Sequence, residues 1–125
     1  MAELGYPTDV AAFAERVDAI SKNPDDGVLV AEEKEGILGL VAFHSFEMLH
    51  RRGRLGRITA LVVSASARNR GVGRQLLNAA ESHLREKGCV KLEVTSGAQR
   101  AEAHGFYAAH GYYEQRVHFV KKPAT

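Results

Sequence analysis

Cysteine and long apolar runs are scarce in this sequence of 125 residues, and each scarcity excludes a class of protein. The single thiol, Cys89, cannot form an internal disulfide, and without a second thiol a zinc cluster is disfavoured, so we expect no bound metal. No apolar run reaches the roughly 20 residues that a membrane span requires. The N-terminus also lacks the basic segment and apolar core of a secretion signal. We therefore expect a cytoplasmic protein without a membrane partner.

The sequence also has little excess of charge of either sign, with 17 Lys and Arg against 15 Asp and Glu. The net charge of +2 is too small to indicate nucleic-acid binding, although four arginines lie close together at Arg51, Arg52, Arg54 and Arg57. These arginines form either a solvated hairpin face or a positive rim for an anionic ligand. A small RNA-binding domain is a disfavoured alternative, which a steep salt dependence of binding would reveal. Nucleic acid is therefore not an expected partner.

The residues that are present describe one soluble globular domain. Hydrophobic residues make up 45% and charged residues 26% of the chain, and residues 1–125 suit a single core. Apolar residues recur at helical spacing in three segments and alternate or cluster, as strands do, in the others. The predicted helices are Thr8–Lys22, Gly71–Lys87 and Ala101–His110. The predicted strands are Val28–Glu32, Ile37–Phe46, Leu55–Val63 and Cys89–Thr95, with one or two more in Tyr112–Val120.

The order of these elements predicts an α/β fold in which helices pack on a mixed sheet. In the helix Gly71–Lys87 one face is apolar, and Gly88 ends the helix as a C-cap. In the strand Cys89–Thr95 alternate residues share a face. The apolar helical face consists of Val72, Leu76, Leu77, Ala80 and Leu84. The apolar strand face consists of Val90, Leu92 and Val94.

A glycine-bearing turn connects the apolar strand end at Val63 to the helix Gly71–Lys87. A helix start has backbone N–H groups without intrahelical partners and the positive end of the helix dipole, so it favours an anion. Gly71 and Gly73 allow close approach of a phosphate, and the arginines beside them can add charge-assisted contacts. The turn lacks the G-K-[ST] ending of an ATP loop and the three-glycine dinucleotide fingerprint. A different phosphate-bearing cofactor is therefore favoured.

Two ordered motifs resemble those of the GNAT superfamily of acyl-CoA N-acyltransferases. Arg68-Asn69-Arg70-Gly71-Val72-Gly73 matches the family signature [RQ]-x-x-G-x-[GA]. Ala103-His104-Gly105-Phe106-Tyr107-Ala108-Ala109-His110-Gly111-Tyr112 looks like the family helix A-x-x-[FL]-Y-x-x-x-G-[FY]. The resemblance implies a mostly antiparallel sheet with helices on both faces. Its first strand would be missing here, because the chain starts close to the helix at Thr8.

The resemblance also implies a cofactor and the residues that bind it. In the family, acetyl-CoA lies between two splayed parallel strands, and its pantetheine arm pairs with the strand end that matches Leu61, Val62 and Val63. The pyrophosphate position maps to the backbone amides from Asn69 to Arg74. Tyr107 matches the tyrosine that protonates the departing CoA sulfur. The cofactor-binding residues implied are Leu61, Val62, Val63, Arg68, Asn69, Arg70, Gly71, Val72, Gly73 and Arg74, and the catalytic residue is Tyr107.

The reaction that the resemblance implies is direct attack of a neutral amine on the thioester. A lysine-like amine with a pKa of about 10.4 must first lose a proton. Glu47, Glu93 and His44 are candidates to accept it, and a chain of waters is an open alternative. The acceptor is a small-molecule or peptide amine, and variable loops such as Glu47–Gly53 build its pocket.

Two departures from the family pattern leave further alternatives open. Arg100 stands where many members have an asparagine that contacts the cofactor, and an arginine would meet the cofactor differently. A missing first strand would leave an open sheet edge, which a partner chain can cover, so we expect a homodimer. A non-catalytic acyl-CoA-binding or regulatory module of the same fold is the alternative to an enzyme, and turnover distinguishes the two.

Overall fold

The computed structural model describes residues 23–33, 36–49, 52–68, 70–95, 101–115 and 119–123. The predicted helix Thr8–Lys22, together with Asn69 and Arg100, lies outside these residues. The remaining predicted helices and the first four predicted strands are all present, each within two residues of its predicted ends. The elements in order are β1 (Asp26–Glu33), β2 (Gly36–Glu47), β3 (Arg54–Val63), the 3₁₀ turn η1 (Ala65–Ala67), α2 (Val72–Glu86), β4 (Cys89–Val94) and α3 (Ala101–Ala109).

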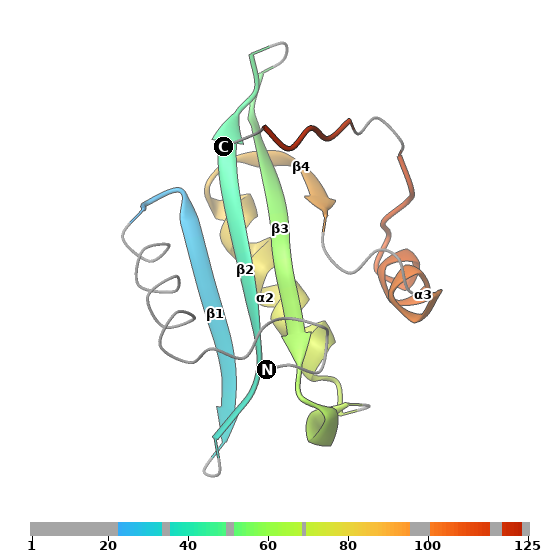
Figure 1. Ribbon diagram of the computed structural model, residues 1–125. Coiled ribbons are helices and arrows are strands. Elements are labelled where there is room, and N and C mark those ends of the chain that lie inside the picture. The colour runs from blue at the N-terminus through green and yellow to red at the C-terminus, as the bar shows by residue number, and fades with distance from the viewer. Residues whose placement is uncertain are drawn as a thin grey trace.

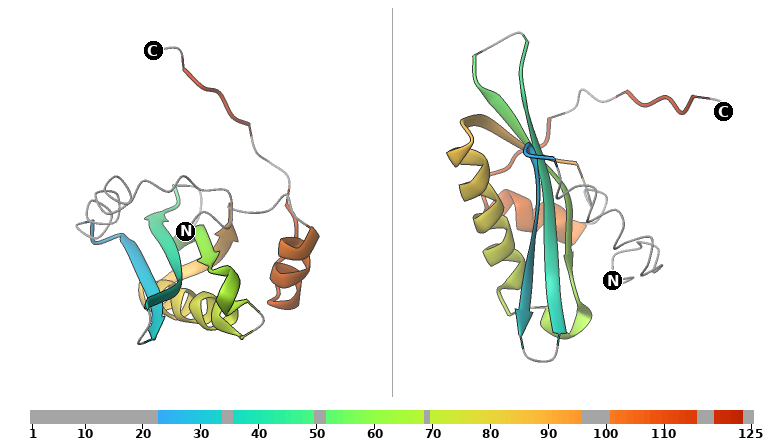
Figure 2. Two further views of the ribbon diagram at one scale, coloured as in Figure 1. Left: turned by 60° about the horizontal axis from the view of Figure 1, so that its bottom comes forward. Right: turned by 90° about the vertical axis from the view of Figure 1, so that its left-hand side faces the viewer.

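The four strands form one sheet in the order β1-β2-β3-β4 (Figure 1). The pairs β1–β2 and β2–β3 are antiparallel and β3–β4 is parallel, which confirms the predicted mixed, mostly antiparallel sheet. The parallel pair arises because α2 returns the chain to the starting end of β3 before β4 begins. Figure 2 shows α2 along one face of the sheet and α3 on the side of β4.

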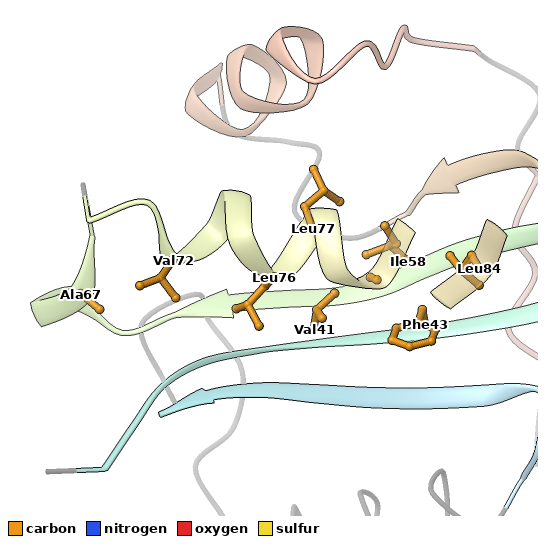
Figure 3. Packing of buried hydrophobic residues seen from close by; sticks show 9 residues of the cluster. Val41, Phe43, Ile58, Ala67, Val72, Leu76, Leu77 and Leu84 are labelled. Atoms are coloured by element: carbon orange, nitrogen blue, oxygen red, sulfur yellow. The ribbon is translucent and has the colours of Figure 1, made fainter. Parts of the chain in front are cut away.

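The core lies between α2 and the sheet. The predicted apolar face of α2 is buried, with Leu77 and Leu84 fully inaccessible to solvent. It packs against Val41, Phe43 and Ile58 of the central strands (Figure 3). A β-carbon on Gly56 would lie 2.8 Å from Leu84 Cδ1, so the missing side chain of Gly56 makes room for that leucine.

Glycines with positive φ mark both ends of α2. Gly71 is the N-cap residue, with φ of 79° in the left-handed region. Gly88 has φ of 89° and directly follows the C-cap residue Lys87, and its N–H donates to the carbonyl of Arg85 at 3.0 Å. This geometry confirms that Gly88 ends the helix, because a left-handed residue at this place turns the chain out of the helix at little steric cost only if it is glycine.

The predicted apolar face of β4 is wrong at Val90. Arg54 pairs with Cys89 while the next residue, Leu55, pairs with Lys91, so Val90 is an extra residue in a β-bulge. The bulge turns the Val90 side chain outward, where 63% of it is exposed. A β-carbon on Gly53 would lie 2.7 Å from Val90 Cγ2, so Val90 lies against Gly53 at the start of β3.

The strands predicted in Tyr112–Val120 are absent from the described residues 112–115 and 119–123. Tyr113 is 81% and Phe119 is 95% exposed, and Figure 2 shows residues 119–123 away from the sheet. The aromatic and β-branched residues favour a strand locally, but a strand also needs a partner with which to form its ladder. That pairing is a tertiary contact, which the local pattern does not specify.

Candidate cofactor and catalytic site

The pairing of the parallel strands β3 and β4 ends halfway along β3, because β4 itself ends there. Their pairing runs from Arg54–Cys89 to Ile58–Val94, and the last bond across it is donated by Thr95 N–H to the Ile58 carbonyl at 3.2 Å. Beyond Ile58, β3 continues to Val63 with β2 as its only strand neighbour among the described residues. Figure 1 shows the end of β4 beside β3 and α3 farther out on the β4 side of the sheet.

The open edge of β3 presents the backbone of two predicted site residues. Ser64 N–H donates to the Leu38 carbonyl of β2 at 2.8 Å. Backbone groups alternate in direction along an antiparallel strand. The N–H and C=O groups of Val62 therefore point to β2, like the Ser64 N–H, whereas those of Leu61 and Val63 point to the open edge. The Val62 side chain is buried, with 4% exposed, and Leu61 and Val63 pack against the core. The backbone of this strand end is therefore rigidly held.

The turn from β3 into α2 leaves helix amides uncapped by side chains. Gly71 offers no side chain to cap the helix, and the first turn contains no acidic residue. The first backbone bond of the helix is Gln75 N–H to the Gly71 carbonyl, at 3.1 Å. The N–H groups of Val72, Gly73 and Arg74 therefore have no partner within the helix, and they lie at the positive end of its dipole.

The arginines of the turn take different directions. Arg74 Nη2 lies 3.6 Å from the position of a β-carbon on Gly71, so the guanidinium folds over the turn. Arg70 donates two hydrogen bonds to the Glu33 carboxylate of β1, at 3.0 and 3.4 Å, and this hydrogen bonding together with the negative charge raises the pKa of Arg70. Arg68 is exposed at the end of η1. Of the predicted arginines, Arg74 therefore lies closest to the helix start.

Tyr107 lies on α3, half-buried between two aromatic rings. Its ring meets Phe106 edge-on, with centroids 5.3 Å apart, and Tyr112 edge-on at 5.8 Å. Phe106 in turn reaches the first turn of α2, because a β-carbon on Gly73 would lie 3.6 Å from its Cζ atom. The helix that carries Tyr107 therefore packs on the start of the helix that carries the glycine turn.

A row of charged residues crosses all four strands of the sheet, one residue before the pairing of β3 and β4 ends. It comprises one residue from each strand, in register: Asp26 opposite His44, His44 opposite Arg57, and Arg57 opposite Glu93. His44 Nδ1 pairs with Asp26 Oδ1, and Arg57 Nε donates to Glu93 Oε1. The Phe46 ring stacks on the His44 ring, with centroids 5.6 Å apart. The Arg57 guanidinium lies over the same Phe46 ring, 5.3 Å from its centroid. We call these four residues the charged row.

Two of the three base candidates belong to the charged row. His44 and Glu93 are 39% and 31% exposed at their side chains, so both are accessible to solvent and to a ligand. Glu47 instead lies opposite Arg54 at the far end of β3, about 13 Å from Ile58 at roughly 3.3 Å per residue. Arg57 was predicted only as part of an arginine cluster, and Asp26 was not predicted at all, because only the strand register brings them together.

The described residues form neither a cluster of metal ligands nor a membrane-spanning helix. Among them, no three His, Cys, Asp or Glu side chains come together to hold a metal ion. None of the helices in that part of the chain is long and apolar enough to cross a membrane. Burial raises the pKa of the Cys89 thiol, which therefore stays protonated at neutral pH and is a poor nucleophile.

The mixed sheet, the parallel pair β3–β4 and the glycine turn are the features that the two motifs predicted for an acyltransferase fold, and sequence comparison shows the family. The Acetyltransferase (GNAT) family matches the chain over residues 3–112. The chain belongs to this family.

The chain is also similar to named N-acetyltransferases. The chain is 30% identical over 113 residues to the aminoalkylphosphonate N-acetyltransferase of Salmonella typhimurium, covering 90% of this chain and 73% of the relative. It is 32% identical over 116 residues to glucosamine 6-phosphate N-acetyltransferase 1 of Oryza sativa subsp. japonica, covering 89% and 68%. A solved aminoglycoside N-acetyltransferase in complex with CoA superposes with a TM-score of 0.76 at 19% identity, covering 91% of this chain and 87% of that one. The last likeness concerns the fold alone.

Proposed function

We propose that this chain transfers the acetyl group of acetyl-CoA to a primary amine by direct attack in a ternary complex. The observation that carries the proposal is the continuity of two binding features. The open edge of β3 at Leu61 and Val63 leads within ten residues to the uncapped amides of α2. A ligand with an amide-bearing arm followed by a pyrophosphate matches both features in that order.

The described residues fit CoA chemically. Among the described residues, the edge-facing backbone groups of Leu61 and Val63 have no strand partner, so they would pair with amides of the pantetheine arm as an added strand would. The N–H groups of Val72, Gly73 and Arg74 would hold the pyrophosphate, with Arg74 adding positive charge. Arg68, Asn69 and Arg70 complete the proposed phosphate site, and Arg70 would share its charge with Glu33. The bound thioester supplies an acetyl group that is activated for transfer.

The residues of the chain have separate roles in the transfer. The Leu61 N–H, directed at the open edge, would donate to the acetyl oxygen as it gains negative charge. Val62 does not suit this role, because its backbone pairs with β2. Tyr107 would give its hydroxyl proton to the departing sulfur. That task is modest because a thiolate is already a good leaving group, so loss of Tyr107 should slow turnover without abolishing it.

The charged row is the proposed acceptor for the proton of the amine. It lies where the pairing of β3 and β4 ends. An amine bound beside the end of β4 reaches both His44 and Glu93. Asp26 beside His44 would stabilise the imidazolium that forms when the ring takes a proton. In Glu93, the carboxylate is held by Arg57. Glu47, at the end of β2 opposite Arg54, lies too far from this place for the role.

The acceptor is proposed to be a small-molecule amine. Two relatives are named for amines that also carry a phosphonate or a phosphate, so such amines should come first in a substrate panel. Aminoglycosides, polyamines, amino acids and peptide N-termini follow. We further propose a homodimer, located in the cytoplasm. Sedimentation equilibrium tests the oligomeric state.

Release of free CoA across this amine panel is the experiment that tests the function. We expect turnover with at least one amine, reduced about 100-fold or less in Tyr107→Phe, which corresponds to the lower range for a general acid. His44→Gln and Glu93→Gln should each lower kcat, whereas Glu47→Gln should not. Tight CoA binding without turnover of any amine would instead support a non-catalytic module.

A further inference from the structure

A buried carboxylate on α2 holds the segment that follows α3. Glu81 is 8% exposed, and its two oxygens have different partners. Oε2 accepts a hydrogen bond from the Tyr112 hydroxyl at 2.7 Å, and Oε1 accepts one from Arg85 at 3.2 Å. Burial raises the pKa of Tyr112 above its ordinary value, and the hydrogen bond and charge of Glu81 raise it further. The tyrosine therefore remains a neutral donor to the Glu81 carboxyl group.

Glu81 is an unusual residue for its position on the helix. The neighbouring buried positions of α2, Leu77, Ala80 and Leu84, are all apolar, and an apolar residue at 81 would avoid the desolvation of a charge. The catalytic scheme above gives Glu81 no role. Its specific contact is the Tyr112 hydroxyl, which suggests that its contribution lies in where it holds Tyr112.

Tyr112 is connected directly to Tyr107 by the way α3 ends. Gly111 has φ of 89°, and its N–H donates to the Ala108 carbonyl at 3.1 Å, while Tyr112 N–H donates to the Tyr107 carbonyl at 3.0 Å. These two bonds form a Schellman motif, in which the residue after the glycine packs on the residue five positions earlier. The Tyr112 ring accordingly meets the Tyr107 ring edge-on, with centroids 5.8 Å apart.

A second contact attaches α3 to the same helix. Phe106 lies against Gly73 in the first turn of α2, eight residues before Glu81. At 1.5 Å per residue the two attachment points are about 12 Å apart along the helix axis. Two separated contacts restrict rotation of α3 as well as its translation. Tyr107 lies between them in sequence, so its place relative to the glycine turn depends on both.

We propose that Glu81 and Tyr112 are positioning residues that hold Tyr107 in place to protonate the sulfur that leaves. This proposal rests on the proposed function. Glu81 fixes the Tyr112 hydroxyl, and Tyr112 fixes the backbone and ring of Tyr107. The proton itself moves only from the Tyr107 hydroxyl to the sulfur as the carbon–sulfur bond breaks. Glu81 and Tyr112 touch neither reactant.

Hydrogen exchange of the full chain tests, without any substrate, whether the bond between Glu81 and Tyr112 holds the end of α3 in place. Tyr112→Phe removes the donor, and Glu81→Leu removes the acceptor with a residue that suits a buried site. Both should speed exchange of the Gly111 and Tyr112 amides by about tenfold, because their bonds open more often. Glu81→Gln keeps an acceptor oxygen and should restore most of the protection. Tyr113→Phe and Glu86→Leu repeat the same changes at exposed positions and should leave these amides unchanged.

Steady-state kinetics with the best amine of the panel tests the catalytic half. Tyr112→Phe and Glu81→Leu should each lower kcat about three- to tenfold, part of the roughly 100-fold that a positioned acid contributes. The KM for acetyl-CoA should not change. In a Tyr107→Phe background the same substitutions should have no further effect on kcat, since the group that they position is gone.

The outcomes separate the two proposals. A further fall in kcat in the Tyr107→Phe background, or a kcat that Tyr112→Phe leaves unchanged, overturns the positioning role while acetyl transfer stands. Unchanged exchange of the Gly111 and Tyr112 amides overturns it as well. Failure of the unaltered chain to release CoA with any amine overturns the proposed function, and the positioning role with it.

Discussion

The two halves of β3 differ in how their backbone is satisfied. From Arg54 to Ile58 the strand is paired on both sides, with Ile58 fully buried and Leu84 packed beneath Gly56. Beyond Ile58, β2 is the only strand partner of β3 among the described residues, and β3 continues to Val63 and into the glycine turn. We call these the paired half and the open half. The same strand therefore has one half built for stability and one half with unfilled hydrogen-bonding capacity.

The difference has a physical consequence for ligand binding. The open half offers backbone groups that have no strand partner among the described residues, so a ligand that pairs with them adds hydrogen bonds on binding. Such a ligand binds the folded chain alone and raises its stability. Substitutions in the paired half should therefore change stability with little effect on affinity, and substitutions at the open half should do the opposite.

The largest effect is expected from Leu84→Ala, beneath the paired half. Leu84 is fully buried, and its loss leaves a cavity between α2 and Gly56. The free energy of unfolding should fall by about 2–5 kcal/mol, measured by urea denaturation. The affinity for CoA, measured by calorimetry on folded protein, should stay within a factor of about three, since the open half is untouched. A loss of affinity larger than this would remove the distinction between the halves.

Sequence patterns anticipated the helices, strands and turn better than the contacts between them. Strand alternation and helical periodicity are local signals, and they predicted β1 to β4 and α2 with ends within two residues. The glycine turn was also predictable, because Gly71 is needed for a left-handed N-cap. The charged row was not, since it depends on three strand registers at once. The hydrogen bond between Glu81 and Tyr112 joins residues 31 positions apart, so no local sequence pattern predicted it.

The two errors in the predicted strands have the same origin. Val90 follows the strand pattern of β4 but becomes the extra residue of a bulge, because Gly53 on the adjacent segment makes room for it. Tyr113 and Phe119 suit a strand, yet the residues described around them have no ladder. In both segments the outcome depends on a neighbour in space, and the sequence pattern reports only neighbours along the chain.

The next largest effect is expected from a pair of glycine substitutions at opposite ends of α2. Gly71 and Gly88 both have positive φ, so an alanine at either place should cost about 1 kcal/mol of stability. Only Gly71 lies at the proposed phosphate site. Gly71→Ala should therefore weaken CoA binding by about tenfold or more, whereas Gly88→Ala should not change it. Equal affinities in calorimetry would place the phosphates elsewhere.

Alkaline pH should weaken the attachment of α3 that borders the open half. The folded state raises the pKa of Tyr112, so in the unfolded chain this tyrosine loses its proton first, near pH 10. Its contribution to stability is thus complete below about pH 10 and declines as the pH rises beyond it. Urea denaturation from pH 8 to 11 should show a shallower decline for Tyr112→Phe than for the unaltered chain. Tyr113→Phe, at an exposed position, serves as the control and should lose stability with pH as the unaltered chain does. If the unaltered chain and Tyr112→Phe lose stability in parallel, this account is wrong.

The smallest effect is expected from Gly73→Ala, although this residue lies in the same turn as Gly71. A β-carbon here would meet Phe106 Cζ and Val63 Cγ2 at 3.6 Å each, an ordinary contact, and φ is not positive. Because alanine favours a helix over glycine, stability should stay the same or rise by up to about 0.5–1 kcal/mol. CoA affinity should fall less than for Gly71→Ala, since the matched signature admits alanine at this position. If Gly73→Ala instead abolished binding in calorimetry, the phosphates would approach the second turn residue more closely than the first, and the proposed role of Gly71 would pass to Gly73.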